Sequence, residues 1–282
     1  MAINFVHVAM QDKSKLEKPE RPEPKSFWYG CYEYPEWCLE WFLYVLSKMA
    51  IFDILDILSK LGVIVAVILF FSEAKERQQR KQYEAWQVII NMQDKSGNGG
   101  RITAIEDLNT DGVSLSGIEV QKAYLSQINL KKANLQAANF SGSTLYGAIF
   151  EQAKLYQAKF ICIKQGQCTD LYKANFQKAN LEDADLRGAD LREVNFVETN
   201  LQNAKLQKAN LQNANFQNAN LKGASLECAK NLISEQVKLA KSWQSAIYDQ
   251  QLSKQLGLST YSTINCSKLK FNPSTKEWEE SK

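Results

Sequence analysis

The chain has 282 residues, a formal net charge of +3 and a single histidine, His7. So small an excess of positive charge excludes the function classes that depend on a strong field, such as non-specific binding of nucleic acid. The six cysteines form no CxxC pair, which excludes a small disulfide scaffold and the usual zinc sites. We therefore expect reduced and mostly buried thiols, except that Cys31 and Cys38 could pair in an oxidising space.

The part of the chain up to Phe71 divides into a polar flank and an apolar segment. Residues 1–36 are predicted to be a flexible flank, because their prolines stand among Lys and Glu residues and bury no core. Residues 37–71 are predicted to be a hydrophobic membrane anchor. The uncharged part, Leu61–Phe71, is about 16 Å long as a helix, so a span of about 30 Å requires extension back to Met49.

Three charged residues decide how this anchor meets a membrane. Asp53, Asp56 and Lys60 follow one another at i, i+3 and i+7, so they share one helical stripe, and Asp56 can pair with Lys60. Each charge costs about 2.5–3.5 kcal/mol at the centre of a span unless the stripe faces protein or the interface. A spanning helix, an interfacial helix and a buried helix pair in a soluble protein stay open, and the uniformly apolar Leu61–Phe71 favours the membrane.

Residues 72–100 are predicted to be a helical linker that ends in a glycine hinge, over 95–101. Four cationic residues lie in the first turns of this linker: Lys75, Arg77, Arg80 and Lys81. By the positive-inside rule, the chain after the anchor lies in the cytoplasm. Tyr83, Trp86 and Ile90 form an apolar stripe that we expect to pack on the next domain.

From Leu115 onward an apolar residue returns at every fifth position. The 22 centres run from Leu115 to Phe160 and from Leu171 to Leu226. The residue two before each centre is small, most often Ala, and the residue between the two is commonly Asn or Asp. Neither a helix, with 3.6 residues per turn, nor a strand, with a period of 2, repeats at five.

The pattern resembles the A(D/N)LXX motif of the pentapeptide-repeat family, over residues 113–228. The resemblance implies a mainly β solenoid, a right-handed quadrilateral β-helix in which five residues form one side and four sides complete a coil. We place this β-helix at residues 101–228, with a short helical cap at 102–108. DLNTDG at 107–112 begins like a calcium loop, but Ile118 stands where the bidentate Glu belongs, so we predict a turn.

The centres of the repeats are predicted to fill the axis of the coil, each beside a small residue. The core residues singled out are Leu135, Phe140, Phe160, Phe176, Leu181, Phe196 and Phe216. Because four sides of five residues complete a coil, the first two phenylalanines should stack in one column and the last three in another.

The repeat breaks over Ile161–Asp170. The centres Phe160 and Leu171 are 11 residues apart instead of 10, so we predict a one-residue bulge that moves the second phenylalanine column to another face. Cys162 and Cys168 flank the break, and we assign them to packing rather than to a redox pair.

Residues 229–282 are predicted to be a helical C-terminal cap and a tail, because a β-helix leaves sheet edges to be covered. The first cap helix begins at Ser234 and turns four residues inward: Val237, Ala240, Trp243 and Ile247. A second helix runs from Asp249 to Gly257, and the tail from Ser262 is expected to be loosely ordered.

We identify no catalytic, cofactor-binding or metal-binding residues, since the sequence has no Ser/His/Asp set, no metal-ligand cluster and no phosphate loop. Anchor and repeat together predict a non-enzymatic scaffold or protein-interaction module that presents a rigid rod to the cytoplasm, on a membrane of the plasma-membrane or thylakoid type. The expected partners are the membrane and an unidentified protein, and an oligomer stays open. The alternative is a subunit or assembly factor of a membrane protein complex, with the stripe Asp53, Asp56 and Lys60 against a partner helix.

A third function is less favoured by the charges. Some members of the family mimic DNA and bind topoisomerase, which requires a strongly acidic rod. Between Asp111 and Glu227 there are 13 Lys or Arg and 11 Asp or Glu residues, a net charge of +2. Such a rod offers no field like that of DNA, and we expect no nucleic-acid partner.

Overall fold

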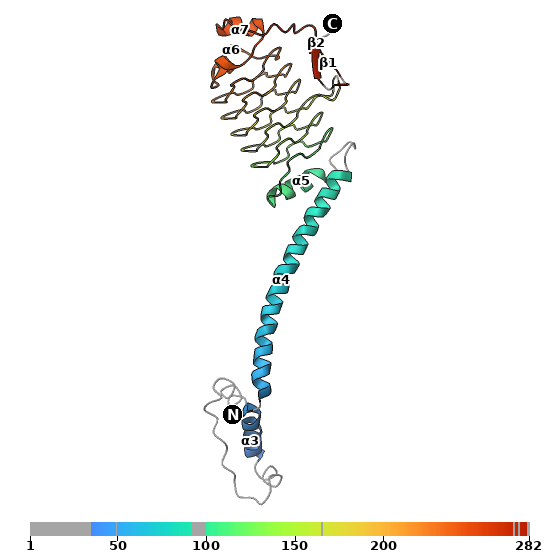
Figure 1. Ribbon diagram of the computed structural model, residues 1–282, viewed down its shortest axis with the longest axis vertical. Coiled ribbons are helices and arrows are strands. Elements are labelled where there is room, and N and C mark those ends of the chain that lie inside the picture. Colours follow the sequence, from blue (N-terminus) through green and yellow to red (C-terminus); the bar gives the residue numbers. More distant parts are fainter. Residues whose placement is uncertain are drawn as a thin grey trace, which may run out of the picture. The chain divides into compact units, whose positions relative to one another are not determined.

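The structure is a computed structural model that describes residues 35–48, 50–91, 100–164, 166–272, 274–275 and 277–280 (Figure 1). Side chains at 35, 46–47, 50–56 and 277–280 lie outside this description. The chain divides into two compact units, Met1–Gln78 and Gln79–Lys282, which are described separately. The predicted flank at 1–36 and the predicted hinge at 95–101 lie outside the described residues, apart from their last two positions.

In the first unit the structure describes helix α3 (Pro35–Lys48) and most of helix α4 (Ala50–Asn91). From Ile57 to Gln78 every side chain of α4 is exposed. Within the described chain, one helical stretch, Ile57–Asn91, is long and apolar enough to cross a membrane; a window of 18 residues within it has a mean hydropathy of 2.1.

In the second unit, the last turns of α4 and helix α5 (Arg101–Thr110) pack against the start of the repeats. Ile105 and Leu108 of α5 are buried in the core with Ile89 of α4, so α5 confirms the predicted cap. The stripe predicted for α4 is wrong for Tyr83 and Ile90, which are 65% and 52% exposed. The helix instead turns Ile89 towards the core.

The turn predicted at 107–112 is confirmed as the end of α5. The N–H of Asp111 donates to the carbonyl oxygen of Asp107 at 2.9 Å, and Gly112 follows with φ of 72°. Glycine adopts this left-handed conformation without steric cost, which explains the Asp–Gly pair.

The repeats form a four-sided parallel coil. Its strands are single-residue bridges, and each residue pairs in parallel with the residue 20 positions later, as Glu119 does with Asn139 and Asn175 with Asn195. Hydrogen bonds such as Leu125 N–H to the oxygen of Thr144, at 2.8 Å, tie each coil to the next. Because successive bridges are five residues apart, four sides complete one coil.

The four columns of bridges define four faces, which we name by the buried residues behind them. Face A holds Val120, Phe140, Phe160, Leu186, Leu206 and Leu226. Face B holds Leu125, Leu145, Leu171, Leu191 and Leu211. Face C holds Leu130, Phe150, Phe176, Phe196 and Phe216. Face D holds Leu115, Leu135, Leu155, Leu181, Leu201 and Leu221. The chain passes the faces in this order, so face A lies opposite face C and face B opposite face D.

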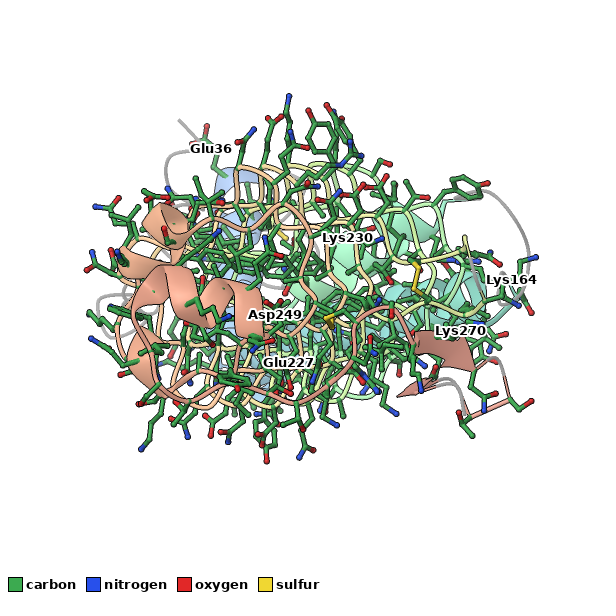
Figure 2. All side chains as sticks on the ribbon, turned by 90° about the horizontal axis from the view of Figure 1, so that it is seen from above. Glu36, Lys164, Glu227, Lys230, Asp249 and Lys270 are labelled. Atoms are coloured by element: carbon green, nitrogen blue, oxygen red, sulfur yellow. A yellow bond between two sulfur atoms is a disulfide. The ribbon has the colours of Figure 1, made fainter. Side chains whose placement is uncertain are left out.

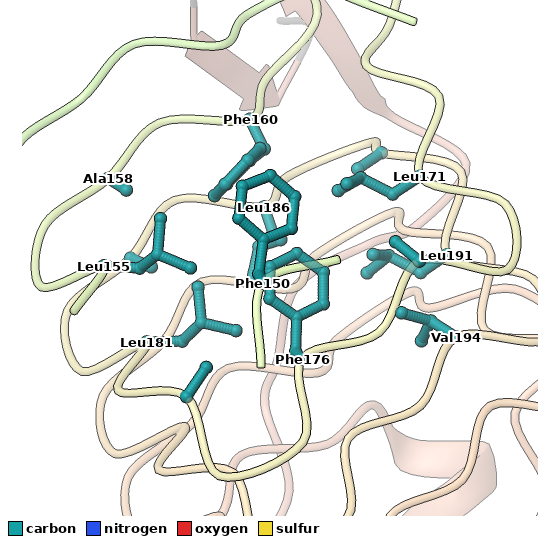
Figure 3. Packing of buried hydrophobic residues seen from close by; sticks show 14 of the residues in the cluster. Phe150, Leu155, Ala158, Phe160, Leu171, Phe176, Leu181, Leu186, Leu191 and Val194 are labelled. Carbon is teal, nitrogen blue, oxygen red and sulfur yellow. The ribbon is translucent and has the colours of Figure 1, made fainter. Parts of the chain in front are cut away.

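The phenylalanines stack in two columns, as predicted. On face A, the rings of Phe140 and Phe160 lie 5.2 Å apart. On face C, Phe176 stacks on Phe196 at 5.6 Å and also on Phe150 at 4.9 Å, the pair seen in Figure 3. The two columns meet edge to face inside the rod, where Phe160 and Phe176 are 5.9 Å apart at 84°. These contacts between rings stabilise the core in addition to the stabilisation that comes from burying the rings.

The one-residue bulge predicted over Ile161–Asp170 is wrong. Thr144 bridges Asp170 instead of Lys164, so the chain is six positions longer across the break than between other bridged residues. The insertion therefore has six residues, and the chain passes from face A at Phe160 to face B at Leu171 without omitting a side. The inserted residues leave the rod as a hairpin, and the bridge ladder continues across it unbroken.

The prediction of reduced thiols is also wrong. The described disulfides are Cys162–Cys168, at the base of the inserted hairpin, and Cys228–Cys266. Cys38 is disulfide-bonded as well, and the described residues include no free cysteine. The pairing considered between Cys31 and Cys38 lies outside the described residues. Sequence spacing did not show these contacts because the insertion and the return of the C-terminal chain create them.

Two local rules form each corner of the coil. The residue two after each centre except Phe160 is left-handed, as at Lys178 (φ 60°) and Asn213 (φ 56°). The Asn or Asp before the centre accepts a hydrogen bond from the N–H two positions later, as Asn175 Oδ1 does from Gln177 at 3.0 Å. Asn and Asp favour such side-chain turns, which explains their place in the repeat.

The C-terminal cap contains α6 (Ser234–Lys238), the 3₁₀ helix η2 (Trp243–Ser245) and α7 (Gln250–Leu256). The long first helix predicted from Ser234 is wrong, because the chain leaves α6 to extend the ladder. Lys241 bridges Asn220 and Ile247 bridges Ser225, which pairs backbone groups of the last coil. Ile247 is consequently 43% exposed, and Tyr248 is buried in its place.

The second cap helix, α7, is confirmed. Asp249 caps its first turn, with its side chain accepting from Gln251 and Leu252, and Gly257 ends it at φ of 75°. The loosely ordered tail is wrong for the described part. There β1 (Leu269–Asn272) pairs antiparallel with β2 (Glu277–Glu280).

Candidate interaction surface

The outward side chains of the four faces are polar and nearly balanced in charge. Over residues 113–228, face A has five Lys or Arg against three Asp or Glu, face B two against three, face C three against two, and face D two against two. No face has a field strong enough to select a ligand by charge alone. A candidate surface must therefore be identified by side-chain type and rigidity.

Face B carries a column of planar side chains in contact, whose two tyrosine rings are tilted by 48° to one another. The rings of Tyr146 and Tyr172 lie 5.6 Å apart, and the guanidinium carbon of Arg192 lies 5.1 Å from the ring centre of Tyr172. All three residues directly follow a core residue of face B, so the coil spacing places them in one column. Tyr146 is 38% exposed, and Tyr124 on the same face is 52% exposed. We call Tyr146, Tyr172 and Arg192 the face B ladder.

The ladder is held in place by its neighbours. The hydroxyl of Tyr172 donates to Glu193 at 3.0 Å, and Lys173 lies over the same ring at 5.0 Å. Arg192 donates to both carboxylate oxygens of Asp190, at 2.6 to 3.0 Å, and this hydrogen bonding raises the pKa of Arg192. Side chains that are already ordered lose less entropy when a partner binds. Tyr and Arg are also the types enriched among the residues that dominate binding energy.

Face D, on the opposite side of the rod, provides a contrast. Its outward column is a ladder of amides, in which Asn220 donates to Asn200 and Asn200 to Asn180, both at 3.0 Å. Its one aromatic residue in the repeats, Tyr156, is half-buried, and desolvation followed by a hydrogen bond to Asp183 raises its pKa. Face D thus has a matched tyrosine without a stacked ladder.

Face A is partly covered by the chain's own C-terminal segment. Thr275 lines a cavity of about 360 Å³ together with Lys159 and Arg187 of face A. Arg187 donates to Asp185 at 2.6 Å, and its side chain is only 12% exposed. Face A is therefore less accessible to a partner than face B.

The residues predicted for the two sites lie in different units. The backbone of Asp53 and Asp56 lies in α4, but their side chains and the pair with Lys60 lie outside the described residues; Lys60 itself is exposed. The seven predicted core residues are at most 1% exposed: Leu135, Phe140, Phe160, Phe176, Leu181, Phe196 and Phe216.

Sequence reasoning missed the face B ladder. The six-residue insertion lies between Tyr146 and Tyr172 in the chain and hides their common place in the repeat. The assumed one-residue bulge placed them on different faces. The signal that could have found the ladder is the shared position one residue after a centre, once the insertion is counted as six.

Comparisons with known proteins agree with the repeat. The family model described as "Pentapeptide repeats" matches in 8 copies, over residues 112–160, 169–207 and 195–230. No curated protein matches the chain. Among solved structures, a pentapeptide repeat protein from the thylakoid lumen of Arabidopsis thaliana is 28% identical, with 44% of this chain and 72% of that chain covered and a TM-score of 0.29.

Two cyanobacterial structures are also similar. HetL, a pentapeptide repeat protein involved in heterocyst differentiation regulation from Nostoc sp. strain PCC 7120, is 27% identical; 48% of this chain and 59% of that chain are covered, with a TM-score of 0.26. A pentapeptide repeat protein from Cyanothece 51142 is 22% identical over 52% of this chain and 93% of that chain, with a TM-score of 0.28.

Proposed function

Because this chain belongs to the pentapeptide-repeat family, we propose that it is a membrane-anchored, non-enzymatic interaction module whose repeat rod binds a protein partner through face B. Proteins of this family are generally structural or interaction proteins rather than enzymes. The observation that carries the proposal is the face B ladder, which presents two tyrosines and an arginine in fixed positions on a rigid backbone.

The anchor of the module is the apolar part of α4. Its side chains are exposed all round the helix, from Val63 at 65% to Phe71 at 67%. An apolar surface that is continuous around a helix favours lipid or a protein partner over water. The polar stripe at Asp53, Asp56 and Lys60 supports the second candidate, a subunit or assembly factor of a membrane complex, because such a stripe is stable against a polar partner helix.

The cytoplasmic side proposed for the rod rests on the positive-inside rule, since cations follow the anchor; Arg77, Arg80 and Lys81 are among them and are exposed. The disulfides bear on this placement. In most organisms, stable disulfides belong to oxidising compartments, and those found in the cytosol are usually catalytic or redox-sensing. A cytoplasmic rod therefore implies that its disulfides exchange with cellular thiols. A rod in a lumen or periplasm would keep them as permanent cross-links.

The interaction is tested with the full chain in its native membranes. Membranes are dissolved in mild detergent, and the tagged chain is recovered with its bound proteins, while a separate portion of the membranes is washed with carbonate. Tyr172→Ala and Arg192→Ala should each reduce the recovered partner by about tenfold or more, as expected when a residue central to an interface is removed. Tyr156→Ala, on face D, is the matched control and should change little.

One outcome would refute the proposed membrane span, and another would refute the proposed binding surface. If the carbonate wash removes the chain, the anchor does not span and an interfacial helix replaces it. If Tyr156→Ala and Tyr172→Ala reduce partner recovery equally, face B is not the binding surface. Trypsin added to sealed vesicles that expose the cytoplasmic side tests the orientation: it should cleave at the exposed Arg77 and Arg80 if the chain after the anchor is cytoplasmic, and in the flank at residues 1–36 if it is not.

A further inference from the structure

The C-terminal segment 258–280, which we call the strap, returns along face A from the last coil towards the first. Its start is fixed at the last coil, where the N–H of Ser262 donates to the oxygen of Tyr248 at 2.8 Å. Further along the strap, Thr275 lines the 360 Å³ cavity, whose walls extend over several coils of face A from Gln121 to Lys205. Leu269, between these points, is only 8% exposed.

One disulfide ties the strap to the rod. Cys228 is the corner residue of the last coil of face A, at φ of 60°, and it is bonded to Cys266 at the middle of the strap. Beside this bond the ammonium group of Lys208 donates to the carbonyl oxygen of Cys266. The other described disulfide, Cys162–Cys168, closes only the inserted hairpin.

The two sulfurs of the tie differ in access. Cys228 is 8% exposed, whereas Cys266 is half-buried between Asn265 and Ser267, which are exposed. An incoming thiolate therefore reaches Cys266 first, and Cys228 is the leaving group.

Charged groups of both signs lie around the bond. Burial lowers the pKa of Lys208, and the neighbouring Lys230 lowers it further, so two cations lie close together here. Asp249 is the opposing carboxylate: its Oδ2 accepts from the N–H of Cys228 at 3.2 Å. It lies close to the buried Glu227 (Figure 2), and desolvation and then Asp249 raise the pKa of the Glu227 carboxyl. Cations near a cysteine stabilise its thiolate and speed thiol–disulfide exchange.

We propose that Cys228–Cys266 is a thiol–disulfide exchange site, and that its reduction by a protein dithiol of the thioredoxin class releases the strap from face A. A donor thiolate attacks Sγ of Cys266, the bond to Cys228 breaks, and Cys228 leaves as a thiolate. The second donor thiol then attacks the mixed disulfide and displaces the thiolate of Cys266. The donor is oxidised to a disulfide, and the two cysteines gain two electrons and, on protonation, two protons.

Release of the strap changes the surface of the rod, because the strap covers part of face A. With the strap removed, Arg187, whose side chain is only 12% exposed, becomes more accessible beside the already exposed Lys159, on the face that has the largest excess of cations. The rod itself should remain folded, because its ladder of bridges between Glu119 and Ser225 does not include the strap. Reduction therefore changes one face and leaves the face B ladder in place.

The test uses the purified full chain in detergent, so it depends neither on the orientation in a membrane nor on a partner. The chain is incubated with reduced thioredoxin or with dithiothreitol, free thiols are labelled with maleimide, and trypsin cleavage at Lys268 and Lys270 is followed with time. Reduction should speed cleavage in the strap by about tenfold or more, since a released segment opens without unfolding the rod, while the rod stays resistant. Unchanged strap cleavage in fully reduced protein would overturn the proposal, as would loss of the rod's resistance together with the strap's.

Variants separate the two disulfides. The double variant Cys228→Ser with Cys266→Ser should show the fast strap cleavage without any reductant, and the matched pair Cys162→Ser with Cys168→Ser should keep the slow, reductant-dependent cleavage. Lys208→Gln should slow the reduction of Cys228–Cys266 several-fold and leave that of Cys162–Cys168 unchanged. Equal slowing at both disulfides, or slow strap cleavage in the first pair, would contradict the assignment. Should the first pair fail to fold by circular dichroism, reduction of the wild-type chain decides.

Discussion

The phenylalanine column of face C gives the sharpest test of the fold. Phe196 is fully buried, and its ring stacks on Phe176 at 5.6 Å and on Phe216 at 5.3 Å. Replacing it with Ala removes the burial of the ring and leaves a cavity that a continuous ladder of coils cannot close, so the free energy of unfolding should fall by about 3–5 kcal/mol. Replacing it with Leu, which fills the same position on other faces, removes only the two ring contacts and should cost about 1–3 kcal/mol.

The assay is urea unfolding of the full chain in detergent, followed by circular dichroism. Gln217→Ala is the control, because Gln217 is exposed one position after a core residue of the same face, and it should stay within about 0.5 kcal/mol of wild type. Comparison requires that the slope of the unfolding free energy against urea be equal in all variants. If Phe196→Ala were no worse than Gln217→Ala, the inward assignment of the column would be refuted.

Three further predictions concern the repeat and its cap. Ala179→Leu should destabilise by about 1–3 kcal/mol through overpacking, whereas Gln212→Lys on the surface should be near neutral; equal thermal shifts would contradict the inward and outward positions. Asn213 is left-handed at φ of 56°, so Asn213→Val should cost about 1–2 kcal/mol in urea unfolding and Asn213→Gly little, and the reverse order would refute the corner geometry. Desolvation and then Asp249 raise the pKa of Glu227 above its ordinary 4.5, so the native state holds that proton more tightly and loses stability as pH rises from 4.5 through the raised value. Glu227→Gln should remove this loss, and identical pH dependence of unfolding in variant and wild type would show that the carboxyl is not desolvated.

The repeat was predictable because its signal is local and recurs. The period of five and the small residue two before each centre predicted the buried positions. The resemblance to the pentapeptide-repeat family implied the four-sided coil and, with it, the two phenylalanine columns. The six-residue insertion was not predictable in this way. The 11 positions from Phe160 to Leu171 fit one side of five residues with a six-residue insertion, and they fit two sides of five residues with a one-residue bulge equally well. Only the bridge from Thr144 to Asp170 decides between the two counts.

The face B ladder was not predicted from the sequence, because the length of the insertion was ambiguous in the same way. Tyr146 and Tyr172 join one column only when the insertion has six residues. The disulfide Cys228–Cys266 and the strap were missed for a different reason. They depend on the chain's return along face A, a contact between residues 38 positions apart that no local pattern records. The prediction of a long first cap helix was wrong because Lys241 and Ile247 form bridges to the last coil in place of helical hydrogen bonds.

The most direct test of an anchored rod that binds through face B is site-specific photo-cross-linking in isolated membranes, which are washed with carbonate only after cross-linking. A photoreactive residue replaces Tyr172 on face B in one variant and Tyr156 on face D in the other. The chain should remain in the membrane pellet, and the face B variant should form a defined adduct with a partner that the face D variant does not form. An adduct of equal yield from both faces, or a chain recovered in the wash instead of the pellet, would contradict the account.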